Sequence, residues 1–315
     1  MTKIITIFGG TGFVGRSIVK RLAQAGYTVR VPTRTLDDAL RLKTAGAVGQ
    51  VVPMLLSHTD DASLQRLIAG SDAVINCIGI LYERGRQKFD HIHHRLPQRM
   101  AAVAQHENVR RFIHLSALGA SITSKSRYAR SKAEGEAAVR SAFPRATLLR
   151  PSVIFGADDN FLNMFAGLAK FLPALPLIGG GKTRFQPIYV GDVAAAAEAC
   201  LNADKTCGRI YELGGPATYS FKELLHYTLQ QTGTPRALVP LPFALAKIQA
   251  FFLSLLPTPL LTPDQVELLK TDNVVSAQAN TLADLGLQPQ ALEVLAPTWL
   301  RRFRPGGMIS ARSFS

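Results

Sequence analysis

A serine, a tyrosine and a lysine stand at spacings that could support acid catalysis on a carbonyl group. Tyr128 and Lys132 are four residues apart, so on a helix they share one face. An ammonium group beside a phenol favours the phenolate and moves the pKa of the phenol toward neutrality. Ser116 precedes the tyrosine by twelve residues and would hydrogen-bond the substrate carbonyl. A tyrosine and a lysine at this spacing are also a frequent coincidence on exposed helices, so the set gains meaning only beside a cofactor site.

A glycine-rich turn near the amino terminus could supply that cofactor site. It lies between an apolar run and a helical pattern, and it satisfies Gly-x-Gly-x-x-Gly. Glycine permits the tight turn, the approach of the backbone to a pyrophosphate, and close packing of helix on sheet. Free amide groups at the positive end of the helix dipole would then bind the pyrophosphate. We expect a dinucleotide here rather than a turn that binds nothing, and the residues expected to bind it are Gly9, Gly10, Thr11, Gly12, Phe13, Val14 and Gly15.

The end of the second expected strand indicates which dinucleotide is bound. An NAD site would carry an acidic residue there to accept hydrogen bonds from the ribose 2′-hydroxyl. This chain has Val31-Pro32-Thr33-Arg34 and no acidic residue before Asp37. Arg34, together with Arg16 on the first helical turn, could pair with a 2′-phosphate through charge-assisted hydrogen bonds. We therefore expect NADP(H), and the residues expected beside its nicotinamide ribose are Asn76, Gly79 and Lys132.

Alternating strand-like and helix-like segments in the first half of the chain would position these residues. Short apolar runs at 3–8, 27–31, 50–55, 73–77, 112–115 and 146–149 are typical of strands. Helical patterns separate them, notably at 12–24, 89–106 and 128–141. Such alternation implies parallel pairing through right-handed crossovers. The expected fold class is α/β, with a doubly wound parallel (Rossmann) sheet.

The sequence changes in character after Pro151. Prolines and glycines become denser, and capping boxes at Ser220-x-x-Glu223 and Thr262-Pro-Asp-Gln265 mark two helix starts. We expect residues 1–155 and 186–213 to form the dinucleotide-binding domain. Residues 156–185 and 214–300 would form a smaller, mainly helical lobe. A basic tail at 301–315 would follow, mobile when the protein is alone.

Composition and charge limit the classes of partner. The 315 residues are 47% hydrophobic and carry a formal net charge of +14, which favours anionic partners. Residues 81–150 hold 14 basic and 5 acidic side chains. No zinc-finger spacing, helix-turn-helix signal or aromatic-interleaved basic run supports nucleic acid as a partner. Three widely spaced cysteines predict neither a disulfide framework nor a zinc site.

The terminal and apolar segments carry two further expectations. Residues 1–8 run directly into a strand pattern, so we expect no signal peptide. The most apolar stretch, 241–261, contains Lys247 and three prolines, and its helical part, 243–256, is too short to cross a bilayer. This segment could lie on a membrane or in a partner's groove, or it could be a buried helix of the smaller lobe.

His91, His93 and His94 form the main histidine cluster of the sequence. On a helix, His91 and His94 share a face and His93 does not. No carboxylate stands at a spacing typical of metal ligands. We therefore expect a polar helix face and no metal site.

Several motifs resemble those of extended short-chain dehydrogenases/reductases: GGTGFVG, HLSALGA, YARSK, RPSVIFG and PIYVGDVA. More narrowly, the chain resembles the NADPH-binding accessory subunit family of respiratory complex I and its bacterial relatives. That resemblance rests on SRYARSKAEGE, RPSVIFGADDNFLNMFA, YELGGP and LTPDQVELLKTDNVV, and it extends over most of residues 1–275. The third strand ends at Pro53-Met54-Leu55-Leu56, without the aspartate that usually contacts adenine in these reductases. The asparagine that often completes their proton relay is not assigned either.

The resemblance implies a bound NADPH, with Pro151 of RPSVIFG among the cofactor contacts. It also implies a structural role in the membrane-proximal part of the peripheral arm of complex I, with complex I subunits as partners. The protein would lie peripherally on the cytoplasmic face of the inner membrane in a bacterium, or on the matrix side in a mitochondrion. The segment 243–256 and the basic surface would then contact the membrane and partner subunits.

Three functions are consistent with these features. The first is a cofactor-binding subunit with little or no turnover, in which Ser116, Tyr128 and Lys132 are residual. The second is an active NADPH-dependent reductase or epimerase that uses the same three residues on a small or isoprenoid-like substrate. The third is a redox-sensing regulator that binds NADP(H) and a protein partner, for which no specific motif is present.

Overall fold

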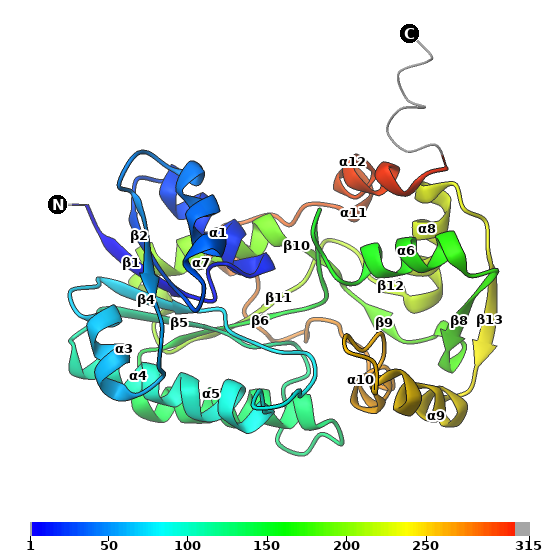
Figure 1. Ribbon diagram of the computed structural model, residues 1–315, viewed down its shortest axis with the longest axis horizontal. Helices are drawn as coiled ribbons and strands as arrows, with labels where there is room; N and C mark the ends of the chain where they lie inside the picture. The colour runs from blue at the N-terminus through cyan, green and yellow to red at the C-terminus, as the bar shows by residue number, and fades with distance from the viewer. Residues whose placement is uncertain (1, 306–315) are drawn as a thin grey trace, which may run out of the picture. The chain divides into compact units, whose positions relative to one another are not determined.

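The computed structural model of the protein describes residues 2–305 (Figure 1). The chain forms two compact units. The first unit consists of Met1–Pro151, Val190–Leu213 and Ser276–Leu287. The second unit consists of Ser152–Tyr189, Gly214–Val275 and Gln288–Ser315. Of the expected basic tail, residues 306–315 lie outside the described residues, and Arg301–Phe303 form a 3₁₀ turn.

A seven-stranded sheet forms the centre of the first unit. Its order is β11-β6-β5-β4-β1-β2-β3, and all neighbouring strands are parallel. The order reverses between β1 and β4, which is where doubly wound sheets bind their ligands. The expected α/β fold with a doubly wound parallel sheet is therefore confirmed. The strands are β1 (Ile4–Phe8), β2 (Thr28–Thr33), β3 (Val51–Leu55), β4 (Ala73–Asn76), β5 (Arg111–Leu115), β6 (Thr147–Pro151) and β11 (Ile210–Leu213).

Helices cover both faces of this sheet (Figure 1). Helix α1 (Phe13–Gln24) packs beside α7 (Val190–Asn202), and α3 (Asp61–Ile68), α4 (Leu96–His106) and α5 (Arg127–Ala142) lie on the opposite face. Apolar residues at helical spacing make this packing possible. In α1, for example, Ile18, Val19 and Leu22 are fully buried. The shorter helical segments of the unit are α2 (Leu36–Leu40), Arg41–Ala45, Asp90–Arg95, Asp204–Thr206 and Ala283–Leu285.

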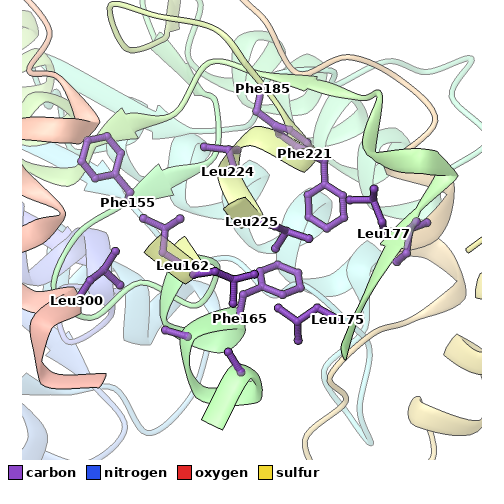
Figure 2. Close-up of a cluster of buried hydrophobic side chains, with 14 of the residues drawn as sticks. Phe155, Leu162, Phe165, Leu175, Leu177, Phe185, Phe221, Leu224, Leu225 and Leu300 are labelled. Carbon is purple, nitrogen blue, oxygen red and sulfur yellow. The ribbon is translucent and has the colours of Figure 1, made fainter. Parts of the chain in front are cut away.

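The second unit is built from helices and two-stranded sheets around its own apolar core. Figure 2 shows this core, which includes Phe155, Phe165, Phe221 and Leu300. The helices are α6 (Leu162–Phe171), α8 (Phe221–Thr232), α9 (Phe243–Leu253), α10 (Pro263–Leu268), α11 (Leu292–Leu295) and α12 (Pro297–Leu300), with a 3₁₀ turn at Gly179–Gly181. The strand pairs are β7 (Ile154–Phe155) with β10 (Ile188–Tyr189), β9 (Arg184–Phe185) with β12 (Tyr219–Ser220), and β8 (Ala174–Ile178) with β13 (Ala237–Leu241).

Both capping boxes expected in this unit are confirmed. The Ser220 side chain accepts a hydrogen bond from the Glu223 amide at the start of α8, and the Glu223 carboxylate accepts one from the Ser220 amide. Thr262 and Gln265 make the corresponding pair at the start of α10. Each box satisfies amide groups that the first helical turn leaves without intrahelical partners.

Helix α9 is apolar but mostly uncovered. Ala246 and Ala250 are its buried residues, whereas Ile248, Phe251 and Phe252 are 57%, 57% and 64% exposed. The interpretation of this segment as a buried helix is therefore wrong. Among residues 2–305, no helix has the length and apolar character needed to span a bilayer.

Candidate functional site: a dinucleotide site at the carboxyl edge of the sheet

The glycine-rich turn joins β1 to α1 in a conformation that its glycines make possible. Gly9 has φ +75°, a conformation that other residues rarely adopt. A Cβ atom on Gly15 would lie 2.1 Å from the Gly9 carbonyl oxygen, so α1 can approach the turn this closely only with glycine at position 15. Gly12 caps α1 without a side-chain hydrogen bond to the first turn. The amide groups of residues 13–15 have no intrahelical acceptor, whereas the Arg16 amide donates to the Gly12 carbonyl oxygen at 2.8 Å. Glycine at positions 9, 10, 12 and 15 leaves the backbone there without side chains of its own.

This turn fits the diphosphate of a dinucleotide. Backbone amide groups and the positive end of the α1 dipole converge where a diphosphate would need donors. The turn follows β1 at the point where the sheet order reverses. Residues 9–15 would therefore hold the diphosphate, with the glycines allowing close approach of the backbone.

Arg16 and Arg34 lie near the turn in the fold, on neighbouring elements. Arg16 is on the first turn of α1, and its Nη1 atom lies 3.4 Å from the Thr11 carbonyl oxygen. Arg34 follows β2, the strand paired with β1 on that side. Both residues are exposed, and Arg34 has no ion pair with any residue that the structure describes. Its guanidinium group is thus available to an anion, and the selection of NADP(H) over NAD(H) stays a prediction.

Asn76 stabilises the loop that follows β4 through a hydrogen bond to its backbone. The residue is completely buried. Its Oδ1 atom accepts a hydrogen bond from the Ile78 amide at 3.0 Å, and its Nδ2 atom lies 3.1 Å from Nδ1 of His114. Asn76 therefore shapes the loop expected beside the nicotinamide ribose. Gly79 in the same loop lies against α5, since a Cβ there would be 3.3 Å from Nζ of Lys132.

Helix α5 carries Tyr128 and Lys132 on one face, as their spacing predicts. The helix begins after Ser126, whose hydroxyl accepts a hydrogen bond from the Ala129 amide. The Lys132 Nζ atom lies 5.9 Å from the centroid of the Tyr128 ring and donates a hydrogen bond to the Leu115 carbonyl oxygen at 3.3 Å. Lys132 thereby reaches from α5 to the end of β5, next to Ser116.

Ser116 is a buried side chain with an unused hydroxyl. It is 5% exposed, and its Oγ atom has no hydrogen-bond partner among the described residues. Buried hydroxyl groups are usually hydrogen-bonded, and an exception calls for a physical explanation. A bound group that supplies the missing partner would account for it. The other expected cofactor contact in this region, Pro151, ends β6, and its carbonyl oxygen accepts a hydrogen bond from the Leu118 amide at 3.0 Å.

The pKa values of the tyrosine and the lysine are set by burial. Burial raises the pKa of Tyr128 to about 12, so the expected shift toward neutrality is wrong. The free-energy cost of removing a phenolate from water exceeds the stabilisation that the Lys132 ammonium group gives it at this geometry. Burial also lowers the pKa of Lys132 to about 8, although the Glu136 carboxylate partly opposes this change. The site therefore favours an uncharged phenol over a phenolate.

His93 belongs to this site, which the sequence analysis did not recognise. The residue lies in a π-helical turn, Asp90–Arg95, and is 1% exposed. His93 is buried while His91 and His94 are partly exposed, so the three side chains divide as their spacing predicts, and the expected polar face does not include His93. Pro97, inside the expected helix, is the sequence signal for the break between this π turn and α4. Proline interrupts α-helical hydrogen bonding, and here it stands in the first turn of α4. His94 instead pairs with Asp90 near the surface.

Two uncharged imidazoles lie close to Lys132. The pKa of His93 is lowered to about 2 and that of His114 to about 3, in both cases mainly by burial and secondarily by the charge of Lys132. Burial likewise raises the pKa of Cys77 to about 12. At neutral pH these three neighbours of the Lys132 ammonium group are therefore uncharged. Within residues 2–305, no three His, Cys, Asp or Glu side chains are grouped so that they could hold a metal ion.

Comparisons with known proteins agree with this geometry. The model of the NAD dependent epimerase/dehydratase family matches residues 5–214. The mitochondrial NADH dehydrogenase (ubiquinone) 1 alpha subcomplex subunit 9 of Arabidopsis thaliana is 41% identical, over 96% of this chain and 79% of the relative. The mitochondrial NADH-ubiquinone oxidoreductase 40 kDa subunit of Neurospora crassa is 33% identical, over 95% of this chain and 79% of the relative.

A solved structure supports the fold. The NADPH-dependent quinone oxidoreductase of Escherichia coli in complex with NADPH superposes with a TM-score of 0.73 at 20% identity, covering 94% of this chain and 99% of that chain. At this identity the similarity shows the fold alone. The long matches at higher identity go further: the chain belongs to the NAD dependent epimerase/dehydratase family and to the family of the NADH dehydrogenase (ubiquinone) alpha subcomplex subunit 9 proteins.

Proposed function

We propose that this protein is an accessory subunit of respiratory complex I that holds NADP(H) and has little or no turnover. The observation that carries this proposal is the extent of the similarity: relatives named as complex I subunits match 95–98% of the chain, so both units are included. The ceramide reductase of Caulobacter vibrioides, by contrast, matches over 61% of the chain. Common ancestry of the dinucleotide unit alone would not account for similarity that extends through the second unit.

In this proposal the first unit is the dinucleotide-binding domain. The turn of residues 9–15 holds the diphosphate, and Arg34 with Arg16 holds the 2′-phosphate. Lys132 and the loop after Asn76 hold the nicotinamide ribose, and Ser116 gains a hydrogen-bond partner when the site is filled. When bound, the cofactor would supply a two-electron reductant, but the residues described here need only bind and orient it.

The state of Tyr128 supports a binding role over turnover. A proton donor works best when its pKa lies near the working pH. Burial instead raises the pKa of Tyr128 to about 12. The Tyr128 ring also packs edge-on against Phe89 and His93, with ring centroids 5.9 Å and 5.4 Å away. The tyrosine thus contributes packing at the site.

The second unit supplies a surface for the membrane. Along α9 and the residues after it, Phe251, Phe252 and Leu255 are exposed, and Lys247 lies on the same helix. A short apolar helix with a basic residue can lie in the interface of an anionic bilayer. Peripheral attachment of this kind requires no spanning helix.

Migration of the tagged full-length protein in native gels of its own membranes tests the proposal. We expect the tag in the band that contains complex I, and loss of assembled complex I when the gene is deleted. A tag found solely at the mass of the free protein would reject the proposal.

An active NADPH-dependent reductase is the second candidate, and the convergence of Lys132 on Tyr128 and on the end of β5 favours it. The purified protein should consume no NADPH with a panel of carbonyl compounds. Sustained consumption that Tyr128→Phe abolishes would establish the reductase instead.

A further inference from the structure

The His93 side chain connects the loop after β4 to helix α5 with both of its ring nitrogens. The Ile80 amide donates a hydrogen bond to Nε2 at 3.0 Å. The other nitrogen, Nδ1, lies 2.9 Å from the Ser131 hydroxyl oxygen. The Ser131 hydroxyl donates in turn to the Tyr128 carbonyl oxygen at 2.8 Å. One buried side chain therefore ties together two segments that both contribute to the proposed cofactor site.

The hydrogen bonds define a single protonation state for the imidazole. Because Nε2 accepts from an amide, it carries a lone pair, and Nδ1 must carry the proton in the neutral ring. Nδ1 then donates to Ser131, whose own proton is committed to Tyr128. A charged imidazolium would place a proton on Nε2 and repel the Ile80 amide. The titratable groups that act on this ring are Lys132 and His114, and the charge of Lys132 further disfavours protonation.

The two segments joined by His93 meet at Lys132. A Cβ on Gly79 would lie 3.3 Å from the Lys132 Nζ atom and 3.7 Å from the His93 Nε2 atom. The hydrogen bond from His93 to the loop therefore determines how close this loop lies to the Lys132 ammonium group. The backbone of His93 is itself held against α5, since a Cβ on Gly135 would lie 1.8 Å from the His93 carbonyl oxygen.

We propose that His93 is the positioning residue for the nicotinamide half of the dinucleotide: it holds residues 77–80 at the right distance from Lys132 and Tyr128. This inference rests on the proposed cofactor role of the first unit. It assigns no contact between His93 and the cofactor. The adenosine half, held by the turn of residues 9–15 and by Arg34, should not depend on His93.

Binding measurements on the full-length protein separate the two halves of the ligand. The probes are the dinucleotide that the wild-type protein binds and its adenosine fragment, which is adenosine 2′,5′-bisphosphate for NADPH or AMP for NADH. His93→Leu should weaken dinucleotide binding by tenfold or more and change fragment binding by less than twofold. His94→Leu, on the same π-helical turn but at the surface, is the matched control and should change neither.

Conservative variants report which hydrogen bond matters. His93→Gln can place an amide oxygen toward the Ile80 amide, and it should recover most of the dinucleotide affinity. His93→Asn reaches only toward Ser131 and should recover little. Should His93→Leu fail to fold, Ser131→Ala removes the second link while keeping the imidazole, and it should weaken the dinucleotide at least threefold more than the fragment. Equal losses for both probes, or no loss for either, would overturn the proposal.

A spectroscopic measurement tests the connection without any cofactor. In ¹⁵N spectra of the ligand-free protein, the His93 ring should remain the neutral Nδ1–H tautomer from pH 5 to pH 8. Titration of His93 in that range would overturn the positioning role. A wild-type protein that binds no dinucleotide, with His93 in the expected tautomer, would instead reject the proposed function and leave the hydrogen-bonded connection intact.

Discussion

Lys132 is a buried ammonium group whose neighbours carry no compensating charge at hydrogen-bonding distance in the described structure. Its hydrogen-bond acceptor is a carbonyl oxygen, that of Leu115, and its imidazole neighbours are neutral. Burying such a charge costs stability unless a ligand offsets the cost. A residue kept under these conditions is typical of a binding site rather than of a packed core.

The free-energy cost of burying the Lys132 ammonium group predicts how the stability of the protein depends on pH. The pKa of Lys132 is about 8 in the folded protein, below its ordinary value of 10.5. Between these two pH values the unfolded chain binds one proton more than the folded protein, so stability rises with pH across that window. Lys132→Met should remove this rise and make the ligand-free protein about 1–3 kcal/mol more stable at pH 7. Urea unfolding of both proteins from pH 7 to pH 10 measures the difference. If the free energies of unfolding of the two proteins changed with pH in parallel, the burial of the Lys132 charge would carry no free-energy cost.

Arg34 determines cofactor choice in this account. Arg34→Ala removes one charge-assisted contact to a 2′-phosphate, so NADPH binding should weaken by about 1.5–3 kcal/mol while NADH binding changes little. Arg41→Ala is the matched control, because it removes another exposed arginine, from the segment that follows α2. Calorimetric titration with both nucleotides gives the comparison. Equal weakening of NADPH and NADH would refute the assignment of the 2′-phosphate to Arg34.

Helix α5 presses against the π-helical turn at Gly135, and this contact sets the position of His93. The Cβ of Gly135→Ala would meet the His93 carbonyl oxygen, which is backbone and cannot turn away. We expect a loss of about 1–3 kcal/mol in the free energy of unfolding, together with weaker dinucleotide binding. Gly167→Ala is the control, since Gly167 lies within α6 with nothing within 4 Å of the added atom. Gly167→Ala should raise the free energy of unfolding by about 0.4–1 kcal/mol. An unchanged free energy of unfolding in Gly135→Ala would contradict the close packing of α5 on the π-helical turn.

Helix α9 is the element that we expect to contact lipid. Replacing Phe251 and Phe252 with serine should reduce binding to vesicles of anionic phospholipid at least tenfold, because it removes exposed apolar area from the helix. Phe171→Ser is the matched control: Phe171 is 86% exposed but ends α6. Sedimentation with vesicles measures the bound fraction. Unchanged binding of the double variant would exclude α9 as the membrane contact.

At the scale of the whole molecule, the sequence predicted the elements that depend on local pattern. The apolar run before Gly9 and both capping boxes are recognisable from neighbouring residues, and the structure has them. The family resemblance, drawn from motifs in both halves of the chain, is confirmed by the long matches.

Properties that depend on tertiary burial could not be predicted in this way. The pKa of Tyr128 moves opposite to the expectation, because the sequence shows the neighbouring lysine but not the loss of solvent. Helical spacing separates His93 from His91 and His94, but it does not show that the buried His93 ring contacts the Ile80 amide and the Ser131 hydroxyl. The apolar pattern of α9 is the same whether the helix is covered or uncovered, so the sequence left both possibilities open.

The nucleotide content of native complex I tests the central claim most directly. Complex I is isolated through a tag on this protein, denatured with acid, and its released nucleotides are quantified by mass spectrometry. We predict one NADP(H) per tagged subunit, and its loss from complex I isolated with the Lys132→Met variant. Recovery of the tagged protein without complex I subunits, or of complex I whose tagged subunit holds no NADP(H), would contradict the account.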